Sequence, residues 1–216
     1  GNYYLFRGEK LNNYVKFADK TWRIVRINND NTIKLIIDDI IEGTVWDDRY
    51  NNKEKISSGK NIYSVSRIKE TLDKYLKSNT LFTNEQKAYI IPSKFCIGPR
   101  KQDDTKMDGS SECSNIIENQ YLGLLAIYEY GIVSLDKDCK YIEDEECSNY
   151  NYLSRLESFW SITANASDSS TVYAVSRRAI TDLANSYYTP GNVLNLSSDI
   201  LYSSGDGSED NPYIIK

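Results

Sequence analysis

The chain has 216 residues, of which 40% are hydrophobic and 26% are charged, a composition typical of a globular protein. Its net charge of -5 argues against a nucleic-acid backbone as a partner, and no run approaches the roughly 20 apolar residues of a membrane-spanning helix. The absence of histidine excludes Ser-His and Cys-His nucleophile pairs and His-rich zinc sites.

The ends of the chain carry two expectations. We interpret Gly1 as a residue left by cloning, so that an N-terminal export or anchoring segment could have been cut away. Membrane attachment is then expected only through such a removed anchor. No internal repeat or low-complexity linker divides the rest, so the simplest expectation is one domain that runs from Asn2 to Lys216.

The first third of the chain predicts an antiparallel meander. Alternating apolar or β-branched residues occur in short runs that are separated by turns: residues 11–17, 21–27 and 33–37. Residues 3–6 would add an edge strand or an ordered tail. The polar stretch 47–60 is expected to be a surface loop.

Helical signals follow the meander. Apolar residues recur at helical spacing, so a helix is expected from about Ser66 to Lys77, capped by Ser64 or Ser66. Leu72 and Leu76 should lie on its inner face. A capping box of Thr83 and Gln86 predicts a second, short helix, and Pro92 marks its end or the loop beyond it.

A β-hairpin is predicted at the centre of the chain. Aromatic and β-branched runs flank a connection of small and turn-forming residues: 158–163, 171–176 and the connection 165–170. Trp160 is the largest apolar side chain of this half and should be buried, as should Trp22 in the first half. Phe159 and Val175 should point inward.

The remaining segments give weaker signals. Residues 121–127 would form a strand that leads into a helical turn at 128–130, and residues 152–156 a further helical turn. Closing strands are expected at 193–196 and 213–215, on either side of a dense group of turn formers. The long connections are expected at Gly98–Glu112, Asn165–Ser170 and Thr181–Gly191.

The four cysteines lie in polar, loop-like sequence and form no C-x-x-C motif. We expect two local disulfides, Cys96–Cys113 and Cys139–Cys147. Each would stabilise the fold by about 2–4 kcal/mol. The alternative is a set of reduced thiols in a cytosolic protein, whereas disulfides would indicate an oxidising, extracytoplasmic environment.

Several short motifs resemble uncharacterised surface-protein domains of low-GC Gram-positive bacteria: Val15-Lys-Phe17, Trp22-Arg-Ile-Val25, Leu72-Asp-Lys-Tyr-Leu76, Leu124–Tyr130, Phe159–Thr163, and the ending from Asn192 through Ser204-Gly-Asp-Gly207 to Ile214. Gly191 and Asn192 replace a usual Arg-Pro pair of that group. The wider pattern resembles the C-type-lectin-like fold, shared with the formylglycine-generating enzyme superfamily. This resemblance implies an α+β fold of small antiparallel sheets, two main helices and long disulfide-stapled loops, in an extracellular or cell-surface setting.

The leading hypothesis for function is a non-catalytic, adhesin-like binding module that uses its loop face. Its ligand would be a glycan, a cell-wall component or a host protein, with no cofactor or metal. The alternative is a structural spacer or interaction domain of a larger surface protein. An enzyme is the least favoured reading, because the thiol-based metal site of the resembling superfamily would need cysteines in the matching strand.

Candidate ligand residues lie in the loops, where binding residues concentrate. They are Tyr187, Tyr188, Asn165, Asp168 and Arg177. We expect both tyrosines and the 165–170 turn on one exposed face, away from both termini. The alternatives are that the tyrosines reflect composition alone and that Arg177 and its neighbour are a solvated pair.

Two acidic segments are candidate calcium sites. Residues 104–115 fail the EF-hand pattern, because Lys106 and Asn115 occupy ligand positions. Asp206, Glu209 and Asp210 form the second candidate, for which a turn held by Asp and Asn side chains is the favoured reading.

Overall fold

The computed structural model describes residues 3–215, so the interpretation of Gly1 and the expected domain ends at Asn2 and Lys216 lie outside the described residues. Within that range the fold is α+β and mostly sheet, with three α-helices. The strands are β1 (Tyr4–Leu5), β2 (Tyr14–Phe17), β3 (Lys20–Ile27), β4 (Ile33–Ile37), β5 (Thr44–Val45), β6 (Ser93–Cys96), β7 (Ile116–Gln120), β8 (Leu122–Leu124), β9 (Phe159–Ala164), β10 (Thr171–Ser176), β11 (Arg178–Leu183), β12 (Tyr187–Tyr188), β13 (Asn192–Leu196), β14 (Tyr202–Ser204) and β15 (Tyr213–Ile215). The helices are α1 (Arg67–Lys77), α2 (Asn84–Lys87) and α3 (Ile127–Val133), with 3-10 turns η1 (Tyr63–Val65), η2 (Glu112–Ser114), η3 (Glu145–Ser148) and η4 (Tyr152–Arg155).

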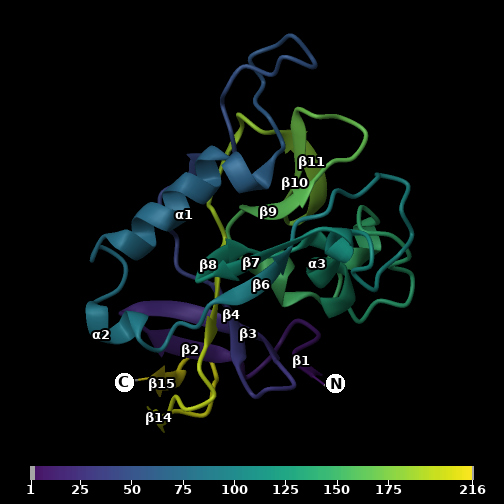
Figure 1. The fold of residues 1–216 in the computed structure, drawn as a ribbon. Helices are drawn as coiled ribbons and strands as arrows, with labels where there is room; N and C mark the ends of the chain where they lie inside the picture. The colour runs from purple at the N-terminus through teal and green to yellow at the C-terminus, as the bar shows by residue number, and fades with distance from the viewer. Residues whose placement is uncertain (1–2, 216) are drawn as a thin grey trace.

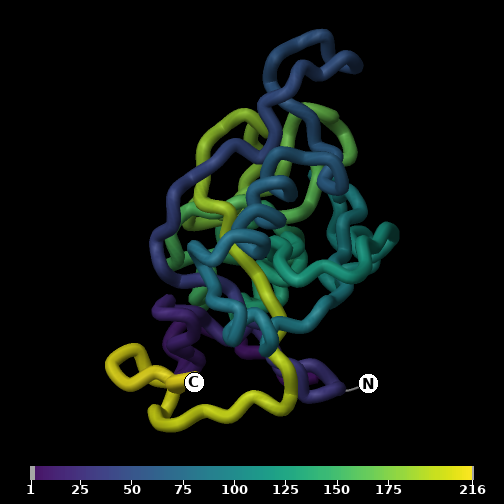
Figure 2. Tube along the Cα trace, turned by 60° about the vertical axis from the view of Figure 1, so that its left-hand side comes forward, coloured from purple at the N-terminus to yellow at the C-terminus, as the bar shows by residue number. Residues whose placement is uncertain are grey.

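The main sheet has the strand order β14-β15-β2-β3-β4-β13-β8, and β1 pairs with β3. The predicted meander is confirmed as the antiparallel pairs β2–β3 and β3–β4. β13 is fully buried, as its central position between β4 and β8 requires, and β15 runs parallel to β2. Both ends of the described chain therefore join the β2–β3 pair, and Figures 1 and 2 show them at the pole opposite the 47–61 loop.

A smaller sheet has the order β11-β10-β9 (Figure 1). It contains the predicted hairpin, in which Phe159 is opposite Val175. Both side chains are buried, with 2% and 1% of their surface exposed, as predicted. The expected connection 181–191 is wrong in part, because its first residues belong to β11 and it contains β12, which pairs with β5. A strand beside β10 satisfies backbone groups that a loop would leave unpaired.

The helices begin where their capping residues predict. The Ser66 hydroxyl accepts a hydrogen bond from the N–H of Lys69 at the start of α1, and the capping box of Thr83 and Gln86 is complete at α2. Leu72 is fully buried under α1, and Leu76 is half-buried against the core. α3 packs against β9 and η4 from another side of the molecule (Figure 1).

The three tryptophans are completely buried, which confirms the prediction for Trp22 and Trp160. Each buried indole N–H needs an acceptor, and each has a backbone carbonyl. Trp22 donates to Phe17 over 2.9 Å, Trp46 donates over 3.0 Å to Ser161, and Trp160 donates to Thr44 over 2.9 Å. The first bond lies within the meander, and the other two join the segment at β5 to strand β9 of the hairpin.

Both predicted disulfides are present, Cys96–Cys113 and Cys139–Cys147, and no cysteine is free. The first links β6 to η2, and the second closes the acidic segment that leads to η3. Disulfides of this kind indicate an oxidising, extracytoplasmic environment. In the described part of the chain, no helix is long and apolar enough to cross a membrane.

The Gly98–Glu112 connection is more buried than its charge suggested. Arg100 and Glu112 are 1% and 0% exposed, and the Nε of Arg100 donates to Glu112 over 2.7 Å. The same guanidinium donates to the carbonyls of Asp104 and Lys106. A buried ion pair needs such additional hydrogen bonds to offset the cost of desolvation. The first disulfide closes this loop at its base, where Arg100 and Glu112 are buried, whereas most of the residues between them are exposed.

Candidate functional site

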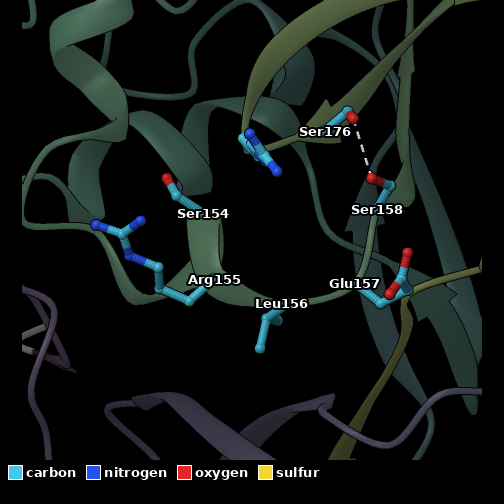
Figure 3. Close-up of a pocket in the computed structure, with 7 residues that line it drawn as sticks. Ser154, Arg155, Leu156, Glu157, Ser158 and Ser176 are labelled. Atoms are coloured by element: carbon cyan, nitrogen blue, oxygen red, sulfur yellow. Dashed lines mark hydrogen bonds between the residues drawn. The ribbon is translucent and has the colours of Figure 1, made fainter.

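Two adjoining pockets open beside the start of β9. The larger, of about 670 Å³, is lined by residues 154–158, Ser176 and Arg177 (Figure 3). The second, of about 380 Å³, shares Ser154, Arg155, Ser176 and Arg177 with the first and adds Glu145, Ser148, Asn149 and Arg178. We call the joint depression the arginine cleft, defined by residues 154–158, 176–178, 145, 148 and 149. Its volume is in the range that small-ligand sites occupy.

The walls of the arginine cleft come from segments on either side of the hairpin. Residues 154–158 form an arc from η4 into β9, as Figure 3 shows. The opposite wall is the tight connection from β10 to β11, where Ser176 faces Arg178 and Arg177 alone joins the strands. The hydroxyl of Ser158 donates to that of Ser176 over 3.0 Å and so links the walls (Figure 3).

A buried tyrosine supports the cleft from below. The hydroxyl of Tyr130 on α3 lies 3.1 Å from that of Ser154 and donates to the carbonyl of Arg177 over 3.4 Å. Burial raises the pKa of Tyr130 above its ordinary value of 10.0, so this hydroxyl stays protonated at neutral pH. Both walls are therefore attached to the same core side chain.

The charges of the arginine cleft are unevenly paired. The Nε of Arg155 donates to Glu9 over 2.8 Å, which satisfies part of that guanidinium. Arg177 and Arg178 are exposed, and neither forms an ion pair within 4.0 Å in the described part of the chain. Glu145 and Glu157 also line the cleft, so it contains both charge signs with cations in excess.

The backbone of Arg177 adopts an unusual conformation. Its φ of 62° lies in the left-handed region that glycine occupies easily and other residues rarely adopt. The tight connection between β10 and β11 imposes this angle. Non-glycine residues held in such regions cost free energy and concentrate at functional sites.

The structure places only one predicted ligand residue, Arg177, at a pocket. Asn165 is 5% exposed, and its amide is used within the turn, donating to Thr171 and accepting from the N–H of Ser167. Asp168 is half-buried and accepts the N–H of Ser170 over 2.7 Å. Both side chains therefore shape the 165–170 turn. Because β10 separates that turn from Arg177, six strand residues at about 3.3 Å each keep them apart.

The tyrosine pair is split between solvent and core. Tyr187 is 65% exposed, and its ring lies over Gly43. Tyr188 is half-buried, with its ring edge-on to Trp160 at 4.7 Å and its hydroxyl donating to Asp182 over 2.6 Å. Burial, together with the hydrogen bond to Asp182, raises the pKa of Tyr188 to about 12. Tyr187 is therefore the member of the pair that a ligand could reach.

The acidic ending forms a turn. The N–H groups of Asp206 and Gly207 both donate to the carbonyl of Asn211, and the Asp206 carboxylate accepts from Ser208. Within residues 3–215, no group of three or more His, Cys, Asp or Glu side chains is placed to hold a metal ion.

Sequence reasoning missed most of the arginine cleft. Ser154, Arg155, Ser158 and Ser176 are not among the residues predicted from the sequence, and the Arg177-Arg178 doublet is the first of two local signals. A second signal was the arginine at the end of the helical turn that precedes the hairpin. Only the folded structure places this arginine, Arg155, in the same pockets as Arg177. No protein-family model, curated protein or solved structure matches this chain.

Proposed function

We propose that the protein is a non-catalytic, extracellular binding module, of adhesin type, whose ligand occupies the arginine cleft. The observation that carries this proposal is the pair of adjoining pockets that meet at Ser154, Arg155, Ser176 and Arg177. A concave surface with a few converging polar groups is the usual form of a ligand site. The two disulfides support the extracellular setting.

The proposal includes the C-type-lectin-like fold. Mostly antiparallel sheets, two longer helices (α1 and α3) and two disulfide-closed loops are features that the C-type-lectin-like fold would have, although the main sheet has eight strands and one parallel pair. The setting on the surface of a Gram-positive cell rests on the sequence resemblance. In this reading the loops and the strand connections carry recognition, and the sheets carry stability.

Two features support binding over catalysis. All four cysteines are bonded in disulfides, so none of them supplies a thiolate nucleophile or metal ligand. In the arginine cleft, the Ser158 hydroxyl donates to Ser176 and Ser154 is paired with Tyr130. A serine nucleophile would need a base as its partner.

The alternative of a structural spacer is less well supported. A spacer in a string of domains is best served by chain ends at opposite poles. Here β1 pairs with β3 and β15 pairs with β2, so both ends join neighbouring strands (Figure 1). This arrangement suits a module that is held from one pole and displays the rest of its surface.

A binding screen tests the proposal. The intact protein, with disulfides formed, would be applied to a glycan array, to cell-wall fractions and to host matrix proteins. We expect binding to at least one class, and loss of that binding when Ser158→Trp fills the cleft. Asp103→Trp on an exposed loop outside the cleft is the size-matched control. Binding to no class, or equal binding by the filled variant, would contradict the proposal.

A further inference from the structure

We propose that the arginine cleft recognises an acidic saccharide, a sugar unit that carries a carboxylate, sulfate or phosphate group. This inference rests on the proposed binding function and names the ligand class of the same site. Its first support is that Arg177 and Arg178 both line the smaller pocket and that neither forms an ion pair within 4.0 Å in the described residues. Guanidinium groups bind oxyanions through two parallel hydrogen bonds.

The neighbouring charges decide where an anion would sit. Arg155 is already bonded to Glu9, and Glu157 lies on the same arc, so these three groups leave that side of the cleft with a net negative charge that would not hold an anion. Arg178 lies close enough to Glu143 to oppose electrostatically the burial that raises the pKa of that carboxyl above its ordinary value. Arg177 lines both pockets, so it is the principal anion contact in this proposal.

The uncharged lining favours a sugar. Ser154, Ser158 and Ser176 present hydroxyls, and Asn149 adds an amide, while Leu156 is the single large apolar side chain of the lining. Hydroxyls donate and accept hydrogen bonds, which matches the hydroxyls of a saccharide. An apolar ligand or a peptide with large side chains would need apolar lining that these walls do not offer.

The conformation of Arg177 supports a ligand role for its side chain. A glycine at φ of 62° would remove the backbone strain, yet the position holds a long cationic residue. The left-handed backbone is held by the β10–β11 pairing and by the Tyr130 hydrogen bond to the Arg177 carbonyl. The guanidinium is thus projected from a fixed base, which lowers the ordering cost of binding.

Calorimetric titration of the intact, disulfide-bonded protein tests the inference. The probes are an oligomer of a uronic acid, a sulfated disaccharide, a glycerol-phosphate oligomer with sugar substituents, a neutral oligosaccharide of equal length, and oligoglutamate. The first, second and third arms separate carboxylate, sulfate and phosphate as the source of the anion. We expect one or more of these three to bind and both the neutral sugar and oligoglutamate to bind at least tenfold more weakly, on the order of one charge-assisted hydrogen bond.

The variants are Arg177→Gly, Arg177→Lys and Lys55→Gly. Lys55 is exposed, lies outside the cleft and has a φ of 57°, so its replacement removes the same charge and relaxes the same backbone region. Arg177→Gly should weaken binding by about tenfold or more, Arg177→Lys should recover part of it, and Lys55→Gly should bind as the native chain does.

Three results would overturn the inference: equal affinity for the neutral sugar, preference for oligoglutamate, or unchanged binding by Arg177→Gly. Absence of binding to every probe would overturn it as well. The array screen keeps these outcomes distinct from the proposed function, because a module that binds a neutral glycan or a protein would still be a binding module.

Discussion

Replacing Arg177 with glycine should leave the protein as stable as before, or make it more stable, although it removes a side chain from the proposed site. The φ of 62° costs an ordinary residue about 1–2 kcal/mol, which glycine avoids. Glycine adds freedom to the unfolded chain, which costs about 0.5–1 kcal/mol. The Arg177 side chain is exposed and forms no ion pair within 4.0 Å in the described residues, so little contact energy is lost.

The two terms together predict a change in the free energy of unfolding from about 0 to 1.5 kcal/mol in favour of Arg177→Gly. In a domain of this size, that corresponds to a rise in Tm of up to about 6 °C. Guanidinium chloride denaturation with intact disulfides measures the free energy, and Arg177→Ala isolates the backbone effect. Alanine removes the same side chain but keeps the strained angle, so its stability should stay within about 0.5 kcal/mol of the native value.

The control is Lys55→Gly, which changes the same backbone region in the exposed 47–60 segment. It should be stabilised to a similar extent. If Arg177→Gly instead lowers the free energy of unfolding by more than about 1 kcal/mol and Lys55→Gly does not, the Arg177 side chain makes a stabilising contact in the fold. That result would contradict the assignment of this side chain to ligand binding.

Three further outcomes are expected. Trp160→Ala should cost about 3–5 kcal/mol in the same denaturation assay, because it removes a fully buried ring, and a loss below about 1 kcal/mol would contradict its central position. Mass spectrometry of the unreduced protein should show peptides joined through Cys96–Cys113 and Cys139–Cys147, and reduction should lower stability by about 2–4 kcal/mol per bond. Burial favours the neutral form of Glu129, but Lys34 and the neighbouring arginine on β3 outweigh it and hold the pKa below its ordinary value of 4.5. The folded state therefore binds fewer protons than the unfolded state just below pH 4.5, so stability should fall as the pH falls through this range, and Glu129→Gln should flatten that part of a pH-dependent unfolding curve.

The local features of this protein were determined by sequence alone. The N-cap at Ser66, the capping box at Thr83 and the hairpin around residues 165–170 each depend on residues within a few positions of one another. The disulfide pairings were also local, because each links cysteines only 17 or 8 residues apart. Short-range steric and hydrogen-bonding preferences are sufficient to specify such elements.

Tertiary structure decided what the loops do. Arg100 and Glu112 belong to a segment that the sequence predicts as a loop, but they form a buried pair in which Arg100 also donates to two backbone carbonyls. Asn165 read as a ligand residue, but its amide is consumed by the turn that it shapes. In each case the hydrogen-bond partner determines what the side chain does, and that partner cannot be identified from the neighbouring sequence.

The arginine cleft is the clearest case of a site that the sequence could not specify. The Arg177-Arg178 doublet was visible as a pair of charges, but the other wall lies about twenty residues earlier, at Ser154 and Arg155. They meet because β9 pairs with β10, and because Tyr130 of α3 bonds to both Ser154 and Arg177. Backbone pairing and a shared buried hydroxyl are properties of the folded chain, so the local sequence showed the Arg177-Arg178 doublet but not the cleft to which it belongs.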